Sequence, residues 1–242
     1  MKKEEVIKRI NPKFLEGVAH RGLHNEQFTE NGLKAFENAI KNNVAFEFDI
    51  HLSKDNKLIV CHDENLKRTT GKEGIIADLT SEEIRANYKL LDGGVVPTLD
   101  ELLELNNEQV PMVIELKAYN KNHKKLAEVT KEYLKKIKDK RNVLIISFDV
   151  RCLWHLKKEG FIRQLLIWKG DKYMFMFRNT VESVDLDKLL FEDRRVRNYS
   201  KKHFVNVWTI ENEEDLNKVL PYADTITFQH IDKDLIKNSL KK

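Results

Sequence analysis

Short apolar runs alternate with amphipathic stretches along the whole chain, and this rhythm limits the possible folds more than any other feature. Each run is too short for a helix and is bounded by polar residues, which is typical of a buried strand. Seven runs are clear, and a less regular eighth occupies 181–190; the seven lie at 17–20, 44–50, 111–116, 142–148, 163–168, 203–208 and 224–227. Strands that alternate with helices predict parallel βαβ units.

The stretches between the runs have helical periodicity, most clearly at 31–42, 121–138, 149–160 and 212–220. Asn212 precedes three acidic residues, as an N-cap residue does before an acidic first turn. Gly160 stands where a glycine would end the helix at 149–160.

Eight strands in a chain of 242 residues favour an α/β fold of the TIM type, a (β/α)8 barrel, which typically needs about 250 residues. A doubly wound open sheet has the same rhythm. Its glycine-rich loop after the first strand is missing, because Ala19-His20-Arg21-Gly22 does not match GxGxxG. The barrel is therefore the predicted fold, and its functional residues should lie at the carboxyl ends of the strands.

No linker rich in Ser, Gly or Pro divides the sequence, so we expect a single domain over residues 1–242. The barrel would occupy 17–235, with a short insertion between its second and third strands at about 55–110. The 43 basic and 39 acidic residues give a net charge of +4, which is too small to indicate nucleic-acid binding.

The cysteine count and the apolar runs bear on the cellular compartment. Two cysteines do not make a disulfide framework. No uncharged apolar run approaches the ~18 residues of a membrane span, and the first residues lack the apolar core of a secretory signal. We expect a cytoplasmic protein.

Residues able to do chemistry cluster at the predicted strand ends. His20 and Arg21 directly follow the first run. In the second run, alternation puts Glu47, Asp49 and His51 on one side of the strand. Carboxylates on an otherwise apolar strand are costly to bury unless a cation or a hydrogen-bond network compensates them.

Two further strand ends extend this set. Glu115 ends the third long run, and Lys117 follows it on the same face. A short strand at 58–61 ends in His62 and Asp63. Because barrel strands end at one rim, we expect all these side chains to meet there.

The combined residue types indicate phosphorus chemistry. Three carboxylates favour a hard divalent ion, Mg²⁺ or Ca²⁺, over zinc. Arg21 and Lys117 supply positive charge for an anion such as phosphate, and two histidines can act as general acid and base. Phosphoryl transfer or phosphodiester cleavage is the predicted reaction class. The structural alternative is an internal salt bridge between the acids and these two cations.

Several motifs, in order, resemble the glycerophosphodiester phosphodiesterase family. They are VAHRG (18–22), ENGLKAFENAI (30–40), FEFDIHLSKDNKLIVCHDENLKRTTG (46–71), IADLTSEEI (76–84), VPTLDELLEL (96–105), VIELK (113–117) and, more weakly, the segment at 205–228. The similarity spans nearly the whole chain and is weakest at 160–200.

The resemblance implies a role for each motif residue. It assigns acid and base catalysis to His20 and His62, phosphate contacts to Arg21 and Lys117, and a place near the substrate to Trp208. The metal ligands it implies, for one Mg²⁺ or Ca²⁺ ion, are Glu47, Asp49 and Glu115.

The family reaction begins with attack of the glycerol's own hydroxyl on phosphorus. The cyclic phosphate that forms is then opened by water. The expected products are glycerol 3-phosphate and an alcohol such as choline or ethanolamine, so the expected partner is a small glycerophosphodiester.

Two positions depart from the family pattern. Gly32 stands where the family often has Ser or Thr, and 227–231 reads Thr-Phe-Gln-His-Ile in place of a Thr-Asp-x-Pro-like segment. Neither removes a catalytic group, and at both positions the resemblance does not define the floor of the substrate pocket.

Other functions remain open on the same barrel. One is a lysophospholipase D or another phospholipid phosphodiesterase, and another is an inactive protein that binds glycerol phosphates. An inactive binder would be expected to lose a catalytic histidine or a metal-binding acid, and this chain keeps all five. The apolar segment at 172–177 either packs into the core or a subunit interface, or contacts an acyl chain or a membrane surface. The sequence specifies no oligomeric state.

Overall fold

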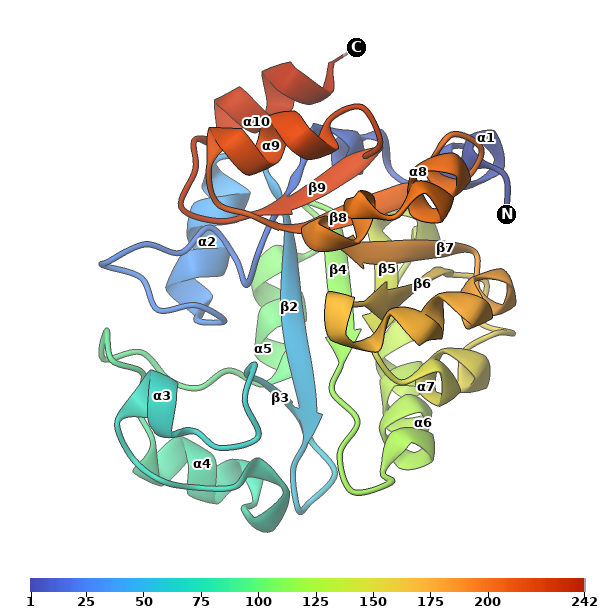
Figure 1. The fold of residues 1–242 in the computed structure, drawn as a ribbon. Coiled ribbons are helices and arrows are strands. Elements are labelled where there is room, and N and C mark those ends of the chain that lie inside the picture. The colour runs from blue at the N-terminus through green and yellow to red at the C-terminus, as the bar shows by residue number, and fades with distance from the viewer. Residues whose placement is uncertain (242) are drawn as a thin grey trace.

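Eight parallel strands close into a barrel in the computed structural model, which describes residues 1–241 (Figure 1). The barrel strands are β1 (Val18–Ala19), β2 (Ala45–Leu52), β4 (Met112–Leu116), β5 (Val143–Ser147), β6 (Ile162–Ile167), β7 (Ser183–Asp187), β8 (Val205–Ile210) and β9 (Thr225–Phe228). The short β1 closes the ring, since Val18 pairs with Ala45 of β2 and Thr227 of β9. The predicted TIM-type barrel is confirmed.

Helices cover the outside of the barrel. They are α2 (Leu33–Lys41), α5 (Leu99–Asn106), α6 (His123–Leu134), α7 (Val150–His155), α8 (Arg194–Ser200), α9 (Glu213–Val219) and α10 (Lys233–Leu240), with the 3₁₀ segments η3 (Lys140–Asn142), η4 (Lys169–Thr180) and η5 (Lys188–Glu192). Asn212 caps α9 as predicted, because its side chain accepts a hydrogen bond from the N–H of Asp215. The prediction for Gly160 was wrong: α7 ends at His155, and Gly160 lies in the loop beyond it with φ +81°.

Alternation along the strands separates two apolar layers. In β2, Phe46, Phe48 and Ile50 face outward and pack toward the helices, where Phe46 contacts Phe36 of α2 at 4.9 Å between ring centroids. The barrel interior holds a second cluster, which includes Val113, Leu144, Ile146, Ile162 and Leu166.

The N-terminal residues, in α1 (Lys3–Ile7) and η1 (Pro12–Glu16), add Val6, Ile10 and Phe14 to this interior cluster. Phe14 is held by its carbonyl, which accepts a hydrogen bond from the Thr225 hydroxyl of β9. Apolar packing therefore fills the amino end of the barrel, and polar chemistry is left to the carboxyl end.

The segment between β2 and β4 carries several short elements in addition to α5. It begins with β3 (Leu58–Val60), which pairs antiparallel to β2, and continues through α3 (Lys67–Thr70), η2 (Ile76–Asp78) and α4 (Ser81–Asn87). It has an apolar cluster of its own, built around Ile59, Leu66, Ile76 and Ile84. Figure 1 shows this segment beside the carboxyl end of β2, so it brings the residues after β3 to the rim of the barrel.

Among residues 1–241, no helix combines the length and apolar character needed to cross a membrane.

Candidate active site

A cavity of about 180 Å³ opens at the carboxyl end of the barrel. Its lining includes seven of the eight side chains singled out from the sequence: His20, Arg21, Glu47, His62, Glu115, Lys117 and Trp208. The eighth, Asp49, adjoins the cavity through Lys117, whose Nζ lies 3.1 Å from Asp49 Oδ1. The structure thus brings all eight residues together.

Three carboxylates meet beneath this cavity. Glu47 and Asp49 point inward from β2, and Asp49 pairs in register with Glu115 of β4. One oxygen from each of the three lies within 4.8 Å of the others. Their exposed fractions are 2%, 0% and 7% for Glu47, Asp49 and Glu115, so they repel one another in a dry environment.

Burial and this repulsion shift the pKa values of the three carboxyl groups. Burial and then the charges of Asp49 and Glu115 raise the pKa of Glu47 well above its ordinary value. Burial likewise raises the pKa of Glu115 to about 7. Burial alone would raise the pKa of Asp49 too, but the nearby Lys117 and Arg21 hold it well below its usual range.

The carboxylate group fits a divalent metal ion. Buried Oε1 of Glu47 has no hydrogen-bond partner among the described residues, and an unpaired carboxylate oxygen in such a site calls for a cation. Oxygen-only donors suit Mg²⁺ or Ca²⁺. The residues present therefore match the ion that the sequence predicts.

Lys117 and Arg21 border the carboxylates. Lys117 Nζ lies 2.7 Å from Glu115 Oε1, and Arg21 Nε lies 3.6 Å from Asp49 Oδ2. The ion pairs weighed as a structural alternative do form, yet they leave Oε1 of Glu47 unpaired among the described side chains. Ion pairing and a metal site are thus compatible here.

Asn31 was not predicted as a site residue, although it lies in a quoted motif. Its Nδ2 donates a hydrogen bond of 2.8 Å to Asp49 Oδ2, which fixes the orientation of that carboxylate. Asn31 has φ +55°, a left-handed conformation that asparagine tolerates better than most residues. An Asn before Gly is also an ordinary turn signal. The local sequence around Asn31 therefore does not predict its hydrogen bond to Asp49.

His20 is a neutral imidazole with one free nitrogen. Its Nδ1 lies 2.6 Å from Oε1 of Gln229; we assign the proton to Nδ1, because an amide oxygen can only accept. Its Nε2 is 4.0 Å from Glu47 Oε2. Burial, and then the charge of Arg21, lower the pKa of His20 to about 3.

His62 has a different partner. Its Nδ1 lies 2.6 Å from Oδ1 of Asp63, and its backbone carbonyl lies 2.9 Å from Nε2 of His51. Burial lowers the pKa of His62, while the carboxylates of Asp49 and Asp63 oppose that shift. A carboxylate on Nδ1 stabilises the imidazolium form.

Arg68, in α3, links His62 to Arg21 through two carboxylates. Its Nε donates to Asp63 Oδ2 at 2.6 Å, and its Nη2 donates to Glu30 Oε1 at 2.8 Å. Glu30 also accepts a hydrogen bond of 2.7 Å from Arg21 Nη1. This chain of charges orients His62 and Arg21 together, and sequence reasoning identified neither Arg68 nor Glu30.

A model of the glycerophosphoryl diester phosphodiesterase family matches residues 20–232. The chain belongs to this family.

Membership confirms the resemblance inferred from the motifs and agrees with individual relatives. A glycerophosphodiester phosphodiesterase of Caldanaerobacter subterraneus is 36% identical over 157 residues, which are 58% of this chain and 61% of that protein. Lysophospholipase D GDPD1 of Homo sapiens is 34% identical, over 52% of this chain and 44% of that protein. The chain thus spans less than two thirds of the length of these relatives.

A solved structure extends the similarity over nearly the whole fold. The glycerophosphodiester phosphodiesterase of Thermotoga maritima is 28% identical and superposes with a TM-score of 0.73. The match covers 93% of this chain and 96% of that one.

The two departures from the family pattern have structural explanations. Gly32 is the residue before α2, and a Cβ there would lie 2.8 Å from the Thr29 carbonyl oxygen and 3.0 Å from Leu90 Cδ1. A Ser or Thr would need the Thr29 loop to move. In the other departure, Gln229 is the partner of His20 described above, so an uncharged amide faces that imidazole.

Trp208 and Asp185 also line the cavity. Trp208 Nε1 donates to the Asp185 carbonyl at 3.2 Å, and its ring meets that of Phe148 edge-on at 5.7 Å. The Asp185 side chain is buried, and burial raises its pKa to about 8. Nothing in the sequence around Asp185 distinguishes it from an ordinary strand residue, so it was missed.

Proposed function

We propose that this protein is a metal-dependent phosphodiesterase that hydrolyses glycerophosphodiesters to glycerol 3-phosphate and an alcohol. The observation that carries the proposal is the convergence of His20, His62 and the carboxylate group on one cavity of about 180 Å³. Membership in the family and the relatives named glycerophosphodiester phosphodiesterase support the same activity.

In this proposal, Glu47, Asp49 and Glu115 hold Mg²⁺ or Ca²⁺. When bound, such an ion polarises a phosphoryl oxygen and neutralises negative charge in the transition state. Arg21 and Lys117 bind and orient the phosphate as fixed cations. Trp208 covers the glycerol moiety with its ring, which half-buried aromatic residues at polar cavities are suited to do.

The partners of the two histidines favour a division of roles. His20 has an uncharged partner and a free Nε2, so it serves as the base that takes the proton from the attacking glycerol hydroxyl. His62, with Asp63 on Nδ1, serves as the acid that protonates the leaving alcohol.

The proposed reaction has two steps. In the first, the glycerol oxygen bonds to phosphorus, the bond from phosphorus to the alcohol oxygen breaks, and a cyclic phosphate forms. In the second, water adds to phosphorus and opens the ring, while the histidines exchange roles. The net reaction consumes one water molecule.

Substitutions test the assignments directly. Release of glycerol 3-phosphate from glycerophosphocholine should fall by about 10²-fold or more in His20→Ala and in Glu47→Gln. Matched controls are His203→Ala and Glu132→Gln, neither of which lines the cavity; both should retain wild-type rates. Equal activity in Glu47→Gln and Glu132→Gln would contradict the metal assignment.

An inactive binding protein would give a different result. In that case no glycerophosphodiester would be consumed, yet glycerol 3-phosphate would raise the melting temperature of the wild type and not that of the Lys117→Met variant. Retention of both histidines and all three carboxylates favours the enzyme.

We further propose that residues 1–242 act as one domain, with the barrel over 17–235 and the insertion at about 55–110. Its partner would be a small molecule and not a nucleic acid. A cytoplasmic location is supported by Cys61 and Cys152, which are both free and buried.

A further inference from the structure

Large apolar side chains are exposed mainly on one side of the barrel rim that surrounds the catalytic cavity. Among the described residues, eight such side chains are at least 39% exposed, and six of them closely follow the carboxyl ends of three neighbouring strands, β4, β5 and β6. We call these six the apolar rim: Tyr119, Phe148, Trp154, Trp168, Tyr173 and Met176. Leu189 follows the next strand, β7, and Leu91 lies between α4 and α5. Exposed apolar side chains gathered on one face mark an interaction surface.

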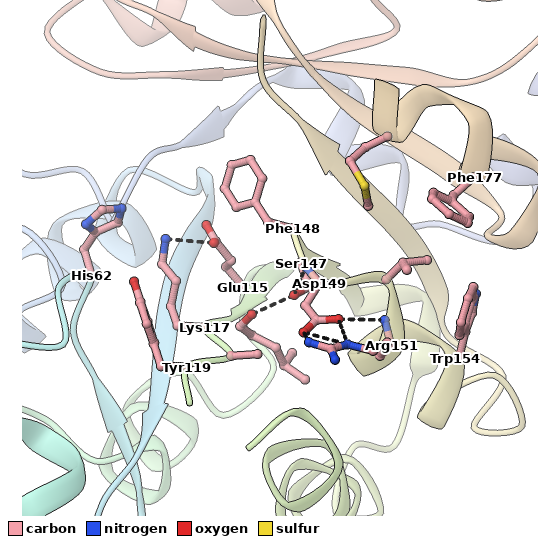
Figure 2. Close-up of a pocket in the computed structure, with 14 residues that line it drawn as sticks. His62, Glu115, Lys117, Tyr119, Ser147, Phe148, Asp149, Arg151, Trp154 and Phe177 are labelled. Carbon is pink, nitrogen blue, oxygen red and sulfur yellow. Dashed lines mark hydrogen bonds and ion pairs between the residues drawn. The ribbon is translucent and has the colours of Figure 1, made fainter. Parts of the chain in front are cut away.

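The apolar rim begins at the catalytic cavity. It borders a hollow of about 780 Å³ that shares four lining residues with the cavity, one of which is Phe148. Figure 2 shows Phe148 between His62 on one side and Trp154 and Phe177 on the other. A partner that covers the apolar rim would therefore lie beside the entrance to the candidate active site.

The segment η4 projects two side chains of the apolar rim into solvent. Its other apolar residues have partners, since Met174 and Phe177 line the hollow and Phe175 packs edge-on against a ring of α8 at 5.2 Å between centroids. Tyr173 and Met176, in contrast, are 64% and 67% exposed. Residues three apart lie on the same side of a 3₁₀ helix, so these two form one outward ridge. The apolar segment 172–177 is thus only partly used for internal packing.

Lysines without ion-pair partners accompany the apolar rim. Residues 118–125 and 168–180, which follow β4 and β6, contain six basic residues and one acidic residue. Lys169 pairs with Glu192. Four other lysines are exposed and form no ion pair among residues 1–241: Lys121, Lys124, Lys125 and Lys172. This side of the rim is therefore both apolar and positively charged.

These two properties together match an anionic lipid surface. Trp and Tyr rings favour the level of the lipid head groups, apolar side chains gain free energy by entering the boundary with the acyl chains, and lysines are attracted to anionic head groups. A second copy of this chain is a poorer match. A two-fold interface would bring two copies of the same positively charged surface together, and like charges there oppose association.

We propose that the apolar rim docks this protein on the surface of an anionic phospholipid bilayer, with the entrance of the catalytic cavity beside the lipid head groups. A glycerophosphodiester is what remains of a phospholipid after both acyl esters have been cleaved. Docking would thus place the site where its proposed substrate arises. The inference requires no lipid substrate, and binding alone tests it.

Vesicle co-sedimentation is the test. Wild-type protein is mixed with vesicles of phosphatidylcholine alone, or of phosphatidylcholine with phosphatidylglycerol, at low and at high salt. We expect binding to the anionic vesicles that weakens as salt rises, because salt screens the attraction. Lys124→Gln combined with Lys125→Gln should weaken binding about fivefold for each lysine removed. Tyr173→Ser combined with Met176→Ser should weaken it about tenfold or more.

Matched control variants lie away from the apolar rim. Leu91→Ser removes a leucine that is 71% exposed. Lys201→Gln combined with Lys202→Gln removes two exposed lysines after α8, where the Lys202 carbonyl accepts a hydrogen bond from the N–H of Lys3 in α1. Both controls should keep wild-type binding.

Hydrolysis of soluble glycerophosphocholine separates docking from the proposed function. Its rate should be the same in all four variants, because none of the substituted residues lines the catalytic cavity. No binding of the wild type to either kind of vesicle, with hydrolysis present, would overturn the docking proposal and leave the proposed function intact.

Two further results would also overturn the docking proposal. Equal losses of binding in the rim variants and the control variants would show an attraction that depends on net charge and not on the apolar rim. A dimer detected by light scattering without vesicles, and dissociated by Tyr173→Ser combined with Met176→Ser, would assign the apolar rim to a second copy of this chain.

Discussion

Nζ of Lys117 lies 2.7 Å from Oε1 of Glu115, and both side chains are buried in the carboxyl end of the barrel. The same nitrogen is 3.1 Å from Asp49 Oδ1. Lys117 therefore partly neutralises the carboxylate group while it also faces the cavity. A phosphate group that binds there would meet an ammonium already fixed in place by two carboxylates.

The first prediction concerns this lysine. Lys117→Met should lower the unfolding free energy of the metal-free protein by about 3–5 kcal/mol, because buried charges lose their partner. The substitution should also enlarge the rise in melting temperature that Mg²⁺ or Ca²⁺ causes. Without the lysine, the carboxylates repel one another more strongly, and a bound cation relieves that repulsion. Denaturant unfolding and thermal melts measure both effects.

A matched surface pair provides the control. Lys135 and Glu132 on the α6 side of the barrel are also 2.7 Å apart, but they are 64% and 66% exposed. Lys135→Met should change stability little, because exposed ion pairs are screened by water. Similar losses in the two variants would mean that burial does not strengthen the Lys117 contacts.

The second prediction concerns metal binding without catalysis. A divalent ion at a hundred times its Kd should stabilise the wild type by about 2.7 kcal/mol. Glu47→Gln should remove most of that gain, because it removes a ligand. The metal-free variant should be at least as stable as the wild type, since Glu47 is a buried carboxylate raised in pKa by its neighbours. A full metal-induced shift in Glu47→Gln would exclude Glu47 as a ligand.

The third prediction uses the pKa of His20, which burial lowers to about 3. Protonation of this base then does not limit kcat/KM until the pH is far below neutral. Gln229→Glu places a carboxylate against Nδ1 and favours the imidazolium, so the pKa of His20 should rise. The acidic fall of the pH–rate profile should move to higher pH. An unchanged profile in Gln229→Glu would show that His20 is not the base.

The fourth prediction concerns Asp185. The unfolded chain loses this proton near pH 4, whereas burial raises the folded pKa to about 8. At this one group the folded state thus binds more protons between these values, so the contribution of Asp185 to the unfolding free energy should fall as pH rises through that window. Asp185→Asn removes the titration, so its stability advantage over the wild type should grow by several kcal/mol from pH 4 to pH 8. The unfolding free energies of Asp185→Asn and the wild type are compared by denaturant unfolding in the presence of a chelator. A difference between the two proteins that does not change with pH would refute the raised pKa of Asp185.

The fold was accessible from the sequence because seven of the eight barrel strands overlap clear apolar runs, and β7 falls within the less regular stretch at 181–190. Alternation in β2 was enough to separate the inward Glu47 and Asp49 from the outward Phe46 and Phe48. The end of α7 was not predicted correctly, since a glycine with positive φ also occurs in ordinary loops.

The contacts that escaped prediction join residues far apart in the sequence. Gln229 reaches His20 across 209 positions of sequence, and Arg68 reaches Glu30 across 38. No local pattern encodes such contacts.

The most direct test of the account is release of glycerol 3-phosphate from glycerophosphocholine by the wild type, before and after chelation by EDTA and again after excess Mg²⁺ or Ca²⁺ is added. The account predicts turnover that EDTA abolishes and that one of the two ions restores. Turnover at an undiminished rate in EDTA would contradict it, because Glu47, Asp49 and Glu115 would then have no metal to hold.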